Sequence, residues 1–325
     1  MSITITTGGV TMTGGGVSFT APPPSTPTAG WYAGGFLSTG RVSTVNRVTF
    51  ATDTATASVR GPLSITKQFE AATGTLTDGW IAAGANPGPL SSVDRITFAT
   101  DTATASARGP LSSARYSLTA TSDNTTYGWF IGGASSPGSG FIIYSTIDRI
   151  TFATDTATAS VRGPMSAVGY NGGASTDGTT YGWFNLGRDG PGLLSSVNRI
   201  TYATDTATAS LRGPLTGTRY KNSATGNTTD GWYIGGFRAG SILSSVERIT
   251  YATDTATASV RGPLFSGART AAASTDSTTY GWIGGGDSTN SVIQRITYAT
   301  DTATASNRGN FVGGGQNWAA TSGVQ

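Results

Sequence analysis

The chain has 325 residues and a formal net charge of +3, only 11% of its residues are charged, and it contains neither His nor Cys. Without these two residue types it cannot form a Ser-His-Asp triad, a thiolate nucleophile or a zinc site with the usual nitrogen and sulfur ligands. The basic residues are spread along the sequence, which argues against a nucleic-acid-binding surface, and no apolar run is long enough to span a membrane.

Residues 1–29 differ in composition from the rest of the chain. Apolar and polar residues alternate in "SITITTGGVTMTGGGVSFT", and the glycines between the runs predict one or two small hairpins. The stretch "APPPSTPTAG" predicts a stiff spacer. A hairpin this small is marginal alone, so we interpret the segment as an anchor arm that adds a strand to a neighbouring subunit. Its apolar anchor residues are Ile3, Ile5, Val10, Met12, Val17 and Phe19.

Residues 30–325 repeat one unit six times. The stretch "TFATDTATAS", or a close variant, follows an arginine and one further residue in every unit, and the units are about 50 residues apart. A period of this size predicts a repeat architecture in which each unit is one supersecondary structure. A Gly-Trp pair recurs in phase with the first marker. Its tryptophans are Trp31, Trp80, Trp129, Trp183, Trp232 and Trp282.

Each unit contains four runs that are typical of short strands. In the third unit these are "RYSLTATS" (115–122), "YGWFIGG" (127–133), "DRITFAT" (148–154) and "TATASVR" (156–162). The runs are rich in β-branched and aromatic residues and are bounded by Gly, Pro, Asp and Ser. No segment shows a sustained helical period with caps, so we expect an all-β fold with almost no helix.

The order of these markers resembles the kelch motif: a double Gly, Arg-Ile-Thr-Tyr, Asp-Thr-Ala-Thr, Gly-Pro-Leu and then Arg. The resemblance covers about residues 29–325 and implies a six-bladed β-propeller with four-stranded blades. The chain departs from the family at two positions. Ala203 follows Tyr202 where the family has Asp, and Ala209 stands where the family has a fourth-strand Trp.

The two ends of the repeat region predict how the ring closes. The first unit begins at "GWYAGGF" and has no inner strand ahead of it, whereas "QNWAATSG" follows the last unit and aligns with an inner strand. We therefore expect residues 316–322 to supply the innermost strand of blade one. This closure would fasten the first blade to the last and remove an exposed sheet edge.

The repeated Trp and Arg residues have structural and functional interpretations. The tryptophans predict a ring of core aromatics, and an aromatic platform for sugars is the alternative. One set of arginines opens the third strand (Arg47 and its equivalents), and another precedes Gly-Pro (Arg60 and its equivalents). We expect salt bridges between blades from both sets; a ring of arginines facing an anionic ligand is the alternative.

An aspartate recurs between the third and fourth strands of every unit. A carboxylate in a tight turn accepts backbone N–H bonds, and this is the role that we expect. Calcium binding is less favoured, because each unit supplies only one carboxylate and calcium needs several converging oxygen ligands. We predict no metal site and no cofactor. The aspartates are Asp53, Asp101, Asp155, Asp205, Asp254 and Asp301.

The connection between the second and third strands varies most between units. The third is the longest and carries Phe141, Ile142, Ile143 and Tyr144 in an expected surface loop. Clustered exposed apolar residues often mark contact with a partner, although the loop could equally pack on its own blade. The other candidate contact residues in these connections are Arg41, Arg188, Asp189, Phe237 and Arg238.

These features predict a non-enzymatic structural or interaction protein, part of a homo-oligomeric or symmetric assembly. The Thr-, Gly- and Ala-rich repeats look like decoration and tail proteins of marine bacteriophages, which implies a virion component held by the arm. A carbohydrate-binding module for host recognition is the alternative. A propeller hydrolase is a third hypothesis, but Glu70, Asp189 and Glu247 form no catalytic motif. Virion proteins and surface glycans are the expected partners, with no nucleic acid and no membrane insertion.

Overall fold

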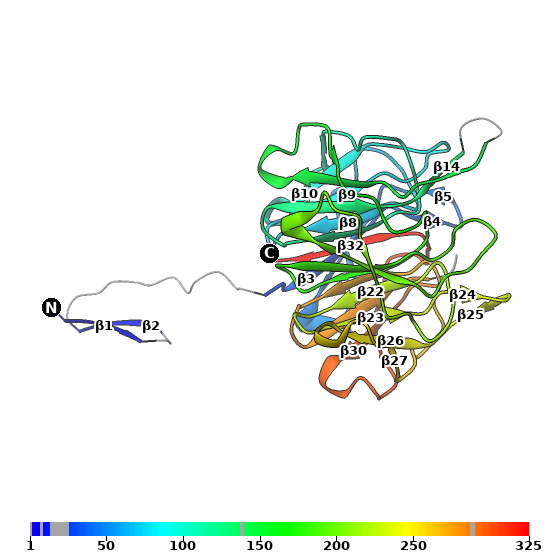
Figure 1. Ribbon diagram of the computed structural model, residues 1–325. Coiled ribbons are helices and arrows are strands. Elements are labelled where there is room, and N and C mark those ends of the chain that lie inside the picture. The colour runs from blue at the N-terminus through cyan, green and yellow to red at the C-terminus, as the bar shows by residue number, and fades with distance from the viewer. Residues whose placement is uncertain (1, 7–8, 14–25, 137–139, 287–289, 325) are drawn as a thin grey trace.

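The computed structural model describes residues 2–6, 9–13, 26–136, 140–286 and 290–324. From residue 26 onward the chain forms six four-stranded antiparallel blades around one axis, which confirms the predicted six-bladed β-propeller (Figure 1). Helical structure in the described residues consists of six three-residue 3-10 turns, one after the third strand of each blade. None of the described helices is long and apolar enough to cross a membrane.

Every blade has the same strand order from the axis outward. The strands of blades one to three are, in that order, β32 (Ala319–Gly323), β3 (Ala29–Ala33), β6 (Val45–Thr49) and β7 (Ser58–Arg60); β8 (Ala71–Gly74), β9 (Asp78–Ala82), β10 (Val93–Thr97) and β11 (Ser106–Arg108); and β12 (Thr119–Ser122), β13 (Tyr127–Ile131), β16 (Ile147–Thr151) and β17 (Ser160–Val161). Those of blades four to six are β18 (Ala174–Thr176), β19 (Tyr181–Asn185), β20 (Val197–Thr201) and β21 (Ser210–Arg212); β22 (Ser223–Gly226), β23 (Asp230–Ile234), β26 (Val246–Thr250) and β27 (Ser259–Arg261); and β28 (Ala272–Thr275), β29 (Tyr280–Gly284), β30 (Val292–Thr297) and β31 (Ser306–Asn310).

The C-terminal strand β32 closes the ring, as the sequence predicts. It pairs antiparallel with β3, and Trp31 lies opposite Thr321. The strand therefore belongs to blade one although it is the last element in the chain. Because β32 also lies beside β28 and β8, it joins the first, second and sixth blades at the axis.

The outer hairpin differs from the sequence prediction. The run "TATASVR" does not form one strand: a 3-10 turn is followed by bends, and the outer strand begins only at the Ser, as in Ser160–Val161 of blade three. The small residues instead lie against the preceding blade. The backbone N–H of Ala105 donates to Pro62 O at 2.8 Å, and that of Gly61 donates to Asp101 O at 2.8 Å. The run is constant because it forms a contact between blades.

The glycine of each Arg-Gly-Pro segment is required by this contact. A Cβ atom added at Gly61 would lie 1.9 Å from the backbone oxygen of Ala103, and one at Gly163 would lie 2.0 Å from that of Ala207. A backbone oxygen cannot move away as the end of a flexible side chain can. Any larger residue would therefore push neighbouring blades apart.

Among the described residues, three of the variable connections contain a small two-stranded hairpin of their own. These pairs are β4 (Phe36–Leu37) with β5 (Gly40–Arg41), β14 (Ala134–Ser135) with β15 (Ile142–Ile143), and β24 (Phe237–Arg238) with β25 (Ser241–Ile242). They lie on one face of the ring, which we call the loop face (Figure 1). The chain enters β3 from the opposite face, because β3 runs toward its own connection on the loop face.

The N-terminal segment contains the predicted hairpin. Strand β1 (Ser2–Thr6) pairs with β2 (Gly9–Thr13), and the register places Ile3 opposite Met12 and Ile5 opposite Val10. The other two anchor residues, Val17 and Phe19, lie outside the described residues.

Candidate functional site

The repeated Trp, Arg and Asp residues form a bond cluster between neighbouring blades, which we call the latch. In the first latch, Trp31 Nε1 donates to Asp101 Oδ2 at 2.9 Å, and Arg47 NH1 donates to the same oxygen at 3.0 Å. Arg60 Nε lies 3.5 Å from it. One carboxylate oxygen of blade two therefore accepts two hydrogen bonds from blade one and also forms an ion pair with Arg60.

The latch recurs around the ring. The donors Trp31, Trp80, Trp129, Trp183, Trp232 and Trp282 bind Asp101, Asp155, Asp205, Asp254, Asp301 and Asp53 respectively, at 2.8 to 2.9 Å. The expectation that the aspartates accept backbone N–H bonds in their own turn is wrong, because their carboxylates bind the preceding blade instead. Salt bridges between blades from both arginine sets are confirmed.

The tryptophans are core residues. All six indoles are at most 2% exposed, and Trp31 stacks on Phe98 of the next blade with ring centroids 3.8 Å apart. Phe50 stacks on Trp282 in the same way at 3.7 Å and continues the pattern across the closure. Because buried rings cannot meet a ligand, the alternative of a tryptophan sugar platform is wrong.

A second polar position is matched within each blade. Lys67, Arg115 and Arg219 precede the inner strands of blades two, three and five, and each pairs with a buried acid on the third strand: Asp94, Asp148 and Glu247 respectively. In the other blades Gly or Ala replaces the base, and a buried amide replaces the acid: Asn198 with Gly169, Gln294 with Ala268, and Asn46 with Gly315. At this position a buried acid is therefore always paired with a buried base, and a neutral amide is found where the base is missing.

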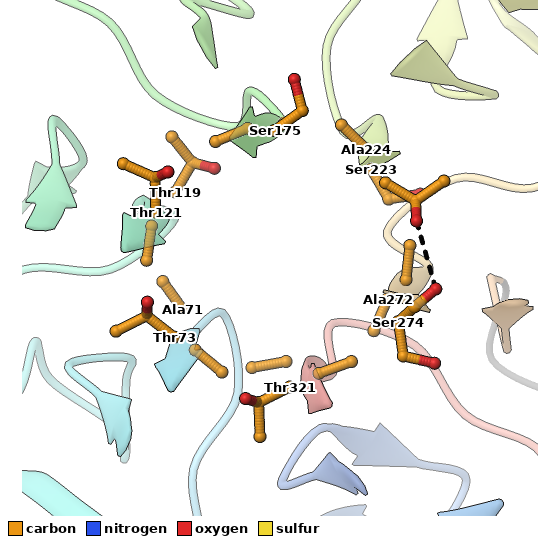
Figure 2. Close-up of a pocket in the computed structure, with 18 of the residues that line it drawn as sticks. Ala71, Thr73, Thr119, Thr121, Ser175, Ser223, Ala224, Ala272, Ser274 and Thr321 are labelled. Atoms are coloured by element: carbon orange, nitrogen blue, oxygen red, sulfur yellow. Dashed lines mark hydrogen bonds between the residues drawn. The ribbon is translucent and has the colours of Figure 1, made fainter. Parts of the chain in front are cut away.

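A cavity of about 430 Å³ lies on the axis and is lined by the six inner strands (Figure 2). One ring of its lining consists of partly exposed alanine residues, and the adjacent ring consists of Thr and Ser. Several hydroxyls of the second ring bond to tyrosines between the blades: Thr121 Oγ1 lies 2.7 Å from Tyr202 Oη, and Thr225 Oγ1 lies 2.8 Å from Tyr298 Oη. Burial raises the pKa of both tyrosines, so their hydroxyls remain neutral.

A ring of six backbone hydrogen bonds surrounds the loop-face end of this cavity. Each member donates its N–H to the carbonyl of the preceding member at 2.7 to 3.1 Å, and the last bond closes the circle. All six have a left-handed backbone, with φ between 55° and 63°, although none is Gly. The members are Phe69, Ser117, Asn171, Lys221, Thr270 and Asn317.

The loop face carries a belt of aromatic and arginine side chains next to this ring, with an arginine after each pair of aromatics. Phe141 meets Tyr170 edge-on at 5.6 Å, and Arg188 lies over Tyr170 and Tyr220 at 5.8 and 5.1 Å. Tyr220 meets Phe237 at 5.8 Å, and Arg269 lies 4.9 Å from the Phe237 ring centroid. The belt is therefore continuous from blade three to blade six. Its residues are Phe141, Tyr170, Arg188, Tyr220, Phe237 and Arg269.

The predicted contact residues divide between this belt and their own loops. Phe141, Arg188 and Phe237 lie in the belt, and Ile142 next to it is 44% exposed. Tyr144 packs on its own blade, since its hydroxyl lies 2.9 Å from Ser135 Oγ, and Ile143 is only partly exposed. Asp189 accepts the N–H of Gly192 within its turn, Arg238 is exposed, and Arg41 lies half-buried in β5.

The residues that sequence reasoning missed are Tyr170, Tyr220 and Arg269. Tyr170 and Tyr220 occupy the same position in successive units, directly before the hydrogen-bonded ring. The sequence shows this recurrence. It was concealed because the whole run, the tyrosine position included, was expected to form an inner strand. Arg269 occupies the same position in the sixth blade.

The described part of the chain contains no group of three or more acidic residues that could hold a metal ion. Glu247 is paired with Arg219, Asp189 lies in its loop, and Glu70 is buried beside the axial cavity. No family model matches the sequence, and no curated protein matches it as a relative.

Proposed function

We propose that this chain is a non-enzymatic interaction protein that binds a partner through the belt on its loop face. The observation that carries the proposal is that different side chains serve the two roles of holding the blades together and forming the exposed belt. The polar residues that repeat in all six blades hold the blades together, whereas the belt combines variable-loop residues with a position whose residue type changes around the ring. A rigid ring with a variable face is suited to recognition, because its contact residues are held in place before a partner arrives.

The composition of the belt supports this role. Tyr, Phe and Arg are enriched at protein interfaces, where they combine large contact area with directed polar bonds. The ring members beneath the belt are fixed by backbone hydrogen bonds, so Tyr170 and Tyr220 start from a rigid base. The partner that we favour is a protein surface.

The N-terminal hairpin supplies the second contact. A two-stranded hairpin is marginal alone, and pairing with a neighbouring subunit would stabilise it. Figure 1 shows the chain entering β3 from the face opposite the hairpins β14 and β24 of the loop face. Because the belt lies on the loop face, a molecule attached by residues 1–29 would present the belt outward. We propose a virion as the assembly, on the resemblance to repeat-rich phage proteins, with kelch-like ancestry for the ring. Mass spectrometry of purified virions tests this setting, and absence of the chain from the particle ends it.

Carbohydrate binding is the second candidate function. It is favoured by the aromatic side chains of the belt, because aromatic rings and arginine together can hold the apolar faces and polar edges of sugars. A glycan array distinguishes the two candidates. Binding that Arg188→Ala abolishes would favour the carbohydrate, and an array without hits leaves the protein partner.

Photo-crosslinking tests the location of the contact. A photoreactive residue placed at Ile142, beside the belt, is expected to form adducts with the partner in the assembled particle. The matched control places the same group at Leu211, which is 63% exposed on the outer rim in β21. Adducts from position 211 alone would contradict the assignment of the loop face.

A further inference from the structure

The chain contains 18 arginines but only two lysines, and one lysine lies in one of two ion pairs whose side chains are both fully buried. Lys67 Nζ is 2.8 Å from Asp94 Oδ2, and both side chains are 0% exposed. The equivalent pairs in blades three and five use Arg115 and Arg219. A lysine can replace arginine as a charge, but only the lysine can become a neutral nucleophilic amine at accessible pH.

We propose that Lys67 and Asp94 condense spontaneously to form an isopeptide bond within blade two. The Lys67 Nζ atom attacks Asp94 Cγ, the new Nζ–Cγ bond forms, and the Cγ–Oδ2 bond breaks. The departing oxygen leaves as water with two protons from the ammonium. Atoms and charge balance without an oxidant or any co-reactant, since one ammonium and one carboxylate give one amide and one water.

The surroundings of the pair favour this reaction. Lys67 Nζ also donates to Ile81 O at 3.1 Å, and Ser64 N donates to Asp94 Oδ1 at 3.3 Å, so both reacting groups are fixed in place. Ile81, Ala82 and Val93 beside them are at most 1% exposed. Burial of two charges away from water is costly, and condensation to a neutral amide removes both charges.

Glu70 supplies the acid that such a condensation needs. It lies three residues after Lys67, and the equivalent positions of the other blades hold Leu118, Gly172, Asn222, Ala271 and Trp318. Burial raises the pKa of Glu70 to about 8, and the nearby Lys67 charge opposes this rise in part. Glu70 is therefore largely protonated at neutral pH. It can take a proton from the attacking amine as it gives one to the departing hydroxyl.

The bond would lock the connection between blades one and two. Lys67 follows the outer strand of blade one, and Asp94 lies on β10, the third strand of blade two. The backbone N–H of Lys67 donates to Val42 O of blade one at 3.1 Å. A covalent link from Lys67 to Asp94 would therefore connect the segment that is hydrogen-bonded to Val42 of blade one with the third strand of blade two.

Intact-mass spectrometry of the full-length, folded and then denatured protein tests the proposal. The wild type is expected to be lighter than its sequence by one water molecule. Its tryptic digest should contain residues 61–95 as one peptide, uncut after Lys67 and lighter by the same mass. A full-mass wild type with normal cleavage at Lys67 would overturn the bond and leave a plain ion pair.

Three variants make the result specific. Lys67→Arg recreates the pairs of blades three and five, so it should fold and keep its full mass; a loss of water there would overturn the assignment to Lys67. Lys221→Arg is the matched control and should still lose one water. Asp94→Asn should lose ammonia instead, and should therefore reach the same final mass as the wild type.

Glu70→Gln tests the role of the acid. It is expected to retain the full mass, or to lose water at least tenfold more slowly after purification than the wild type. Loss of water at the wild-type rate would overturn the proton-relay role of Glu70 while leaving the bond itself in place. Far-ultraviolet circular dichroism checks that the variant is folded.

Discussion

Glu70 is a buried carboxyl group whose ionisation should couple stability to pH. Its folded-state pKa of about 8 lies above the ordinary value of 4.5. Between these two values the folded state holds a proton that the unfolded state has released. The free energy of unfolding should therefore fall as pH rises from about 4.5 to about 8, and this contribution should level off above that. Urea unfolding at a series of pH values measures it, and Glu70→Gln should flatten the profile. An unchanged profile in the variant would contradict the burial of this group.

Thr270 has a strained backbone conformation. Its φ of 55° is left-handed, which is unfavourable for a β-branched residue, whereas its equivalents Asn171 and Asn317 tolerate this region better. Thr270→Asn should therefore raise the free energy of unfolding by about 1 kcal/mol. The control Ser274→Asn, in the adjacent inner strand, should instead be destabilising, because Ser274 is packed against Tyr32. Chemical denaturation of both variants decides the point.

The single residues differ in how well the sequence predicts them. The burial of the tryptophans follows from their register in an apolar run. The bond from Trp31 to Asp101 does not, because the two residues are 70 positions apart and meet only when blades pack. A turn role was the reasonable expectation for Asp101 from its local sequence. The left-handed ring members share no residue type, so their sequence gives no sign of their conformation.

At the scale of elements, the contact between each Arg-Gly-Pro segment and the next blade should be intolerant of a side chain. Gly61→Ala would place a Cβ atom 1.9 Å from Ala103 O, and we expect a loss of about 1–3 kcal/mol or more. Gly88→Ala is the matched control, because a Cβ there has no atom within 4 Å. It should change stability by less than about 0.5 kcal/mol. Equal losses in thermal or urea unfolding would show that the contact is not tight.

The elements also show why a correct strand pattern can misplace a boundary. Three strands of each blade follow from alternation and β-branched content. The fourth begins later than expected. In blade two, for example, Ala105 donates its N–H across the blade interface to Pro62 O, and Ala103 donates to Thr100 O within its own turn, so neither N–H joins the ladder. Strand propensity reflects the local sequence alone, whereas here the contact between blades determines where the fourth strand begins.

For the whole molecule, the closing strand should control the stability of the ring. Deletion of residues 316–325 removes β32 and exposes the inner edge of β3. We expect loss of cooperative thermal unfolding and a tendency to aggregate, because an open blade leaves unpaired backbone groups. Deletion of residues 1–25 is the control and should leave the melting temperature of the ring unchanged. A ring that melts normally without β32 would contradict the closure.

The architecture was largely predictable from the sequence, and the candidate contact surface was predictable only in part. The six copies of the repeat predict the number of blades, and the additional strand at the C-terminal end predicts how the ring closes. The belt depends on which loops meet across blades: Phe141 approaches Tyr170, and Phe237 approaches Tyr220, from different segments of the chain. Loop length and composition identified the face but not the partners within it.

The central claim is that the constant residues of the repeat are a latch between blades, and a double-mutant cycle tests it most directly. Arg47→Ala, Asp101→Ala and the double variant would be compared with the wild type by urea unfolding. The two residues are 54 positions apart and lie in different blades, so coupling must come from the bond between them. The latch predicts a coupling energy of about 1 kcal/mol or more. Losses that add within about 0.3 kcal/mol would contradict it.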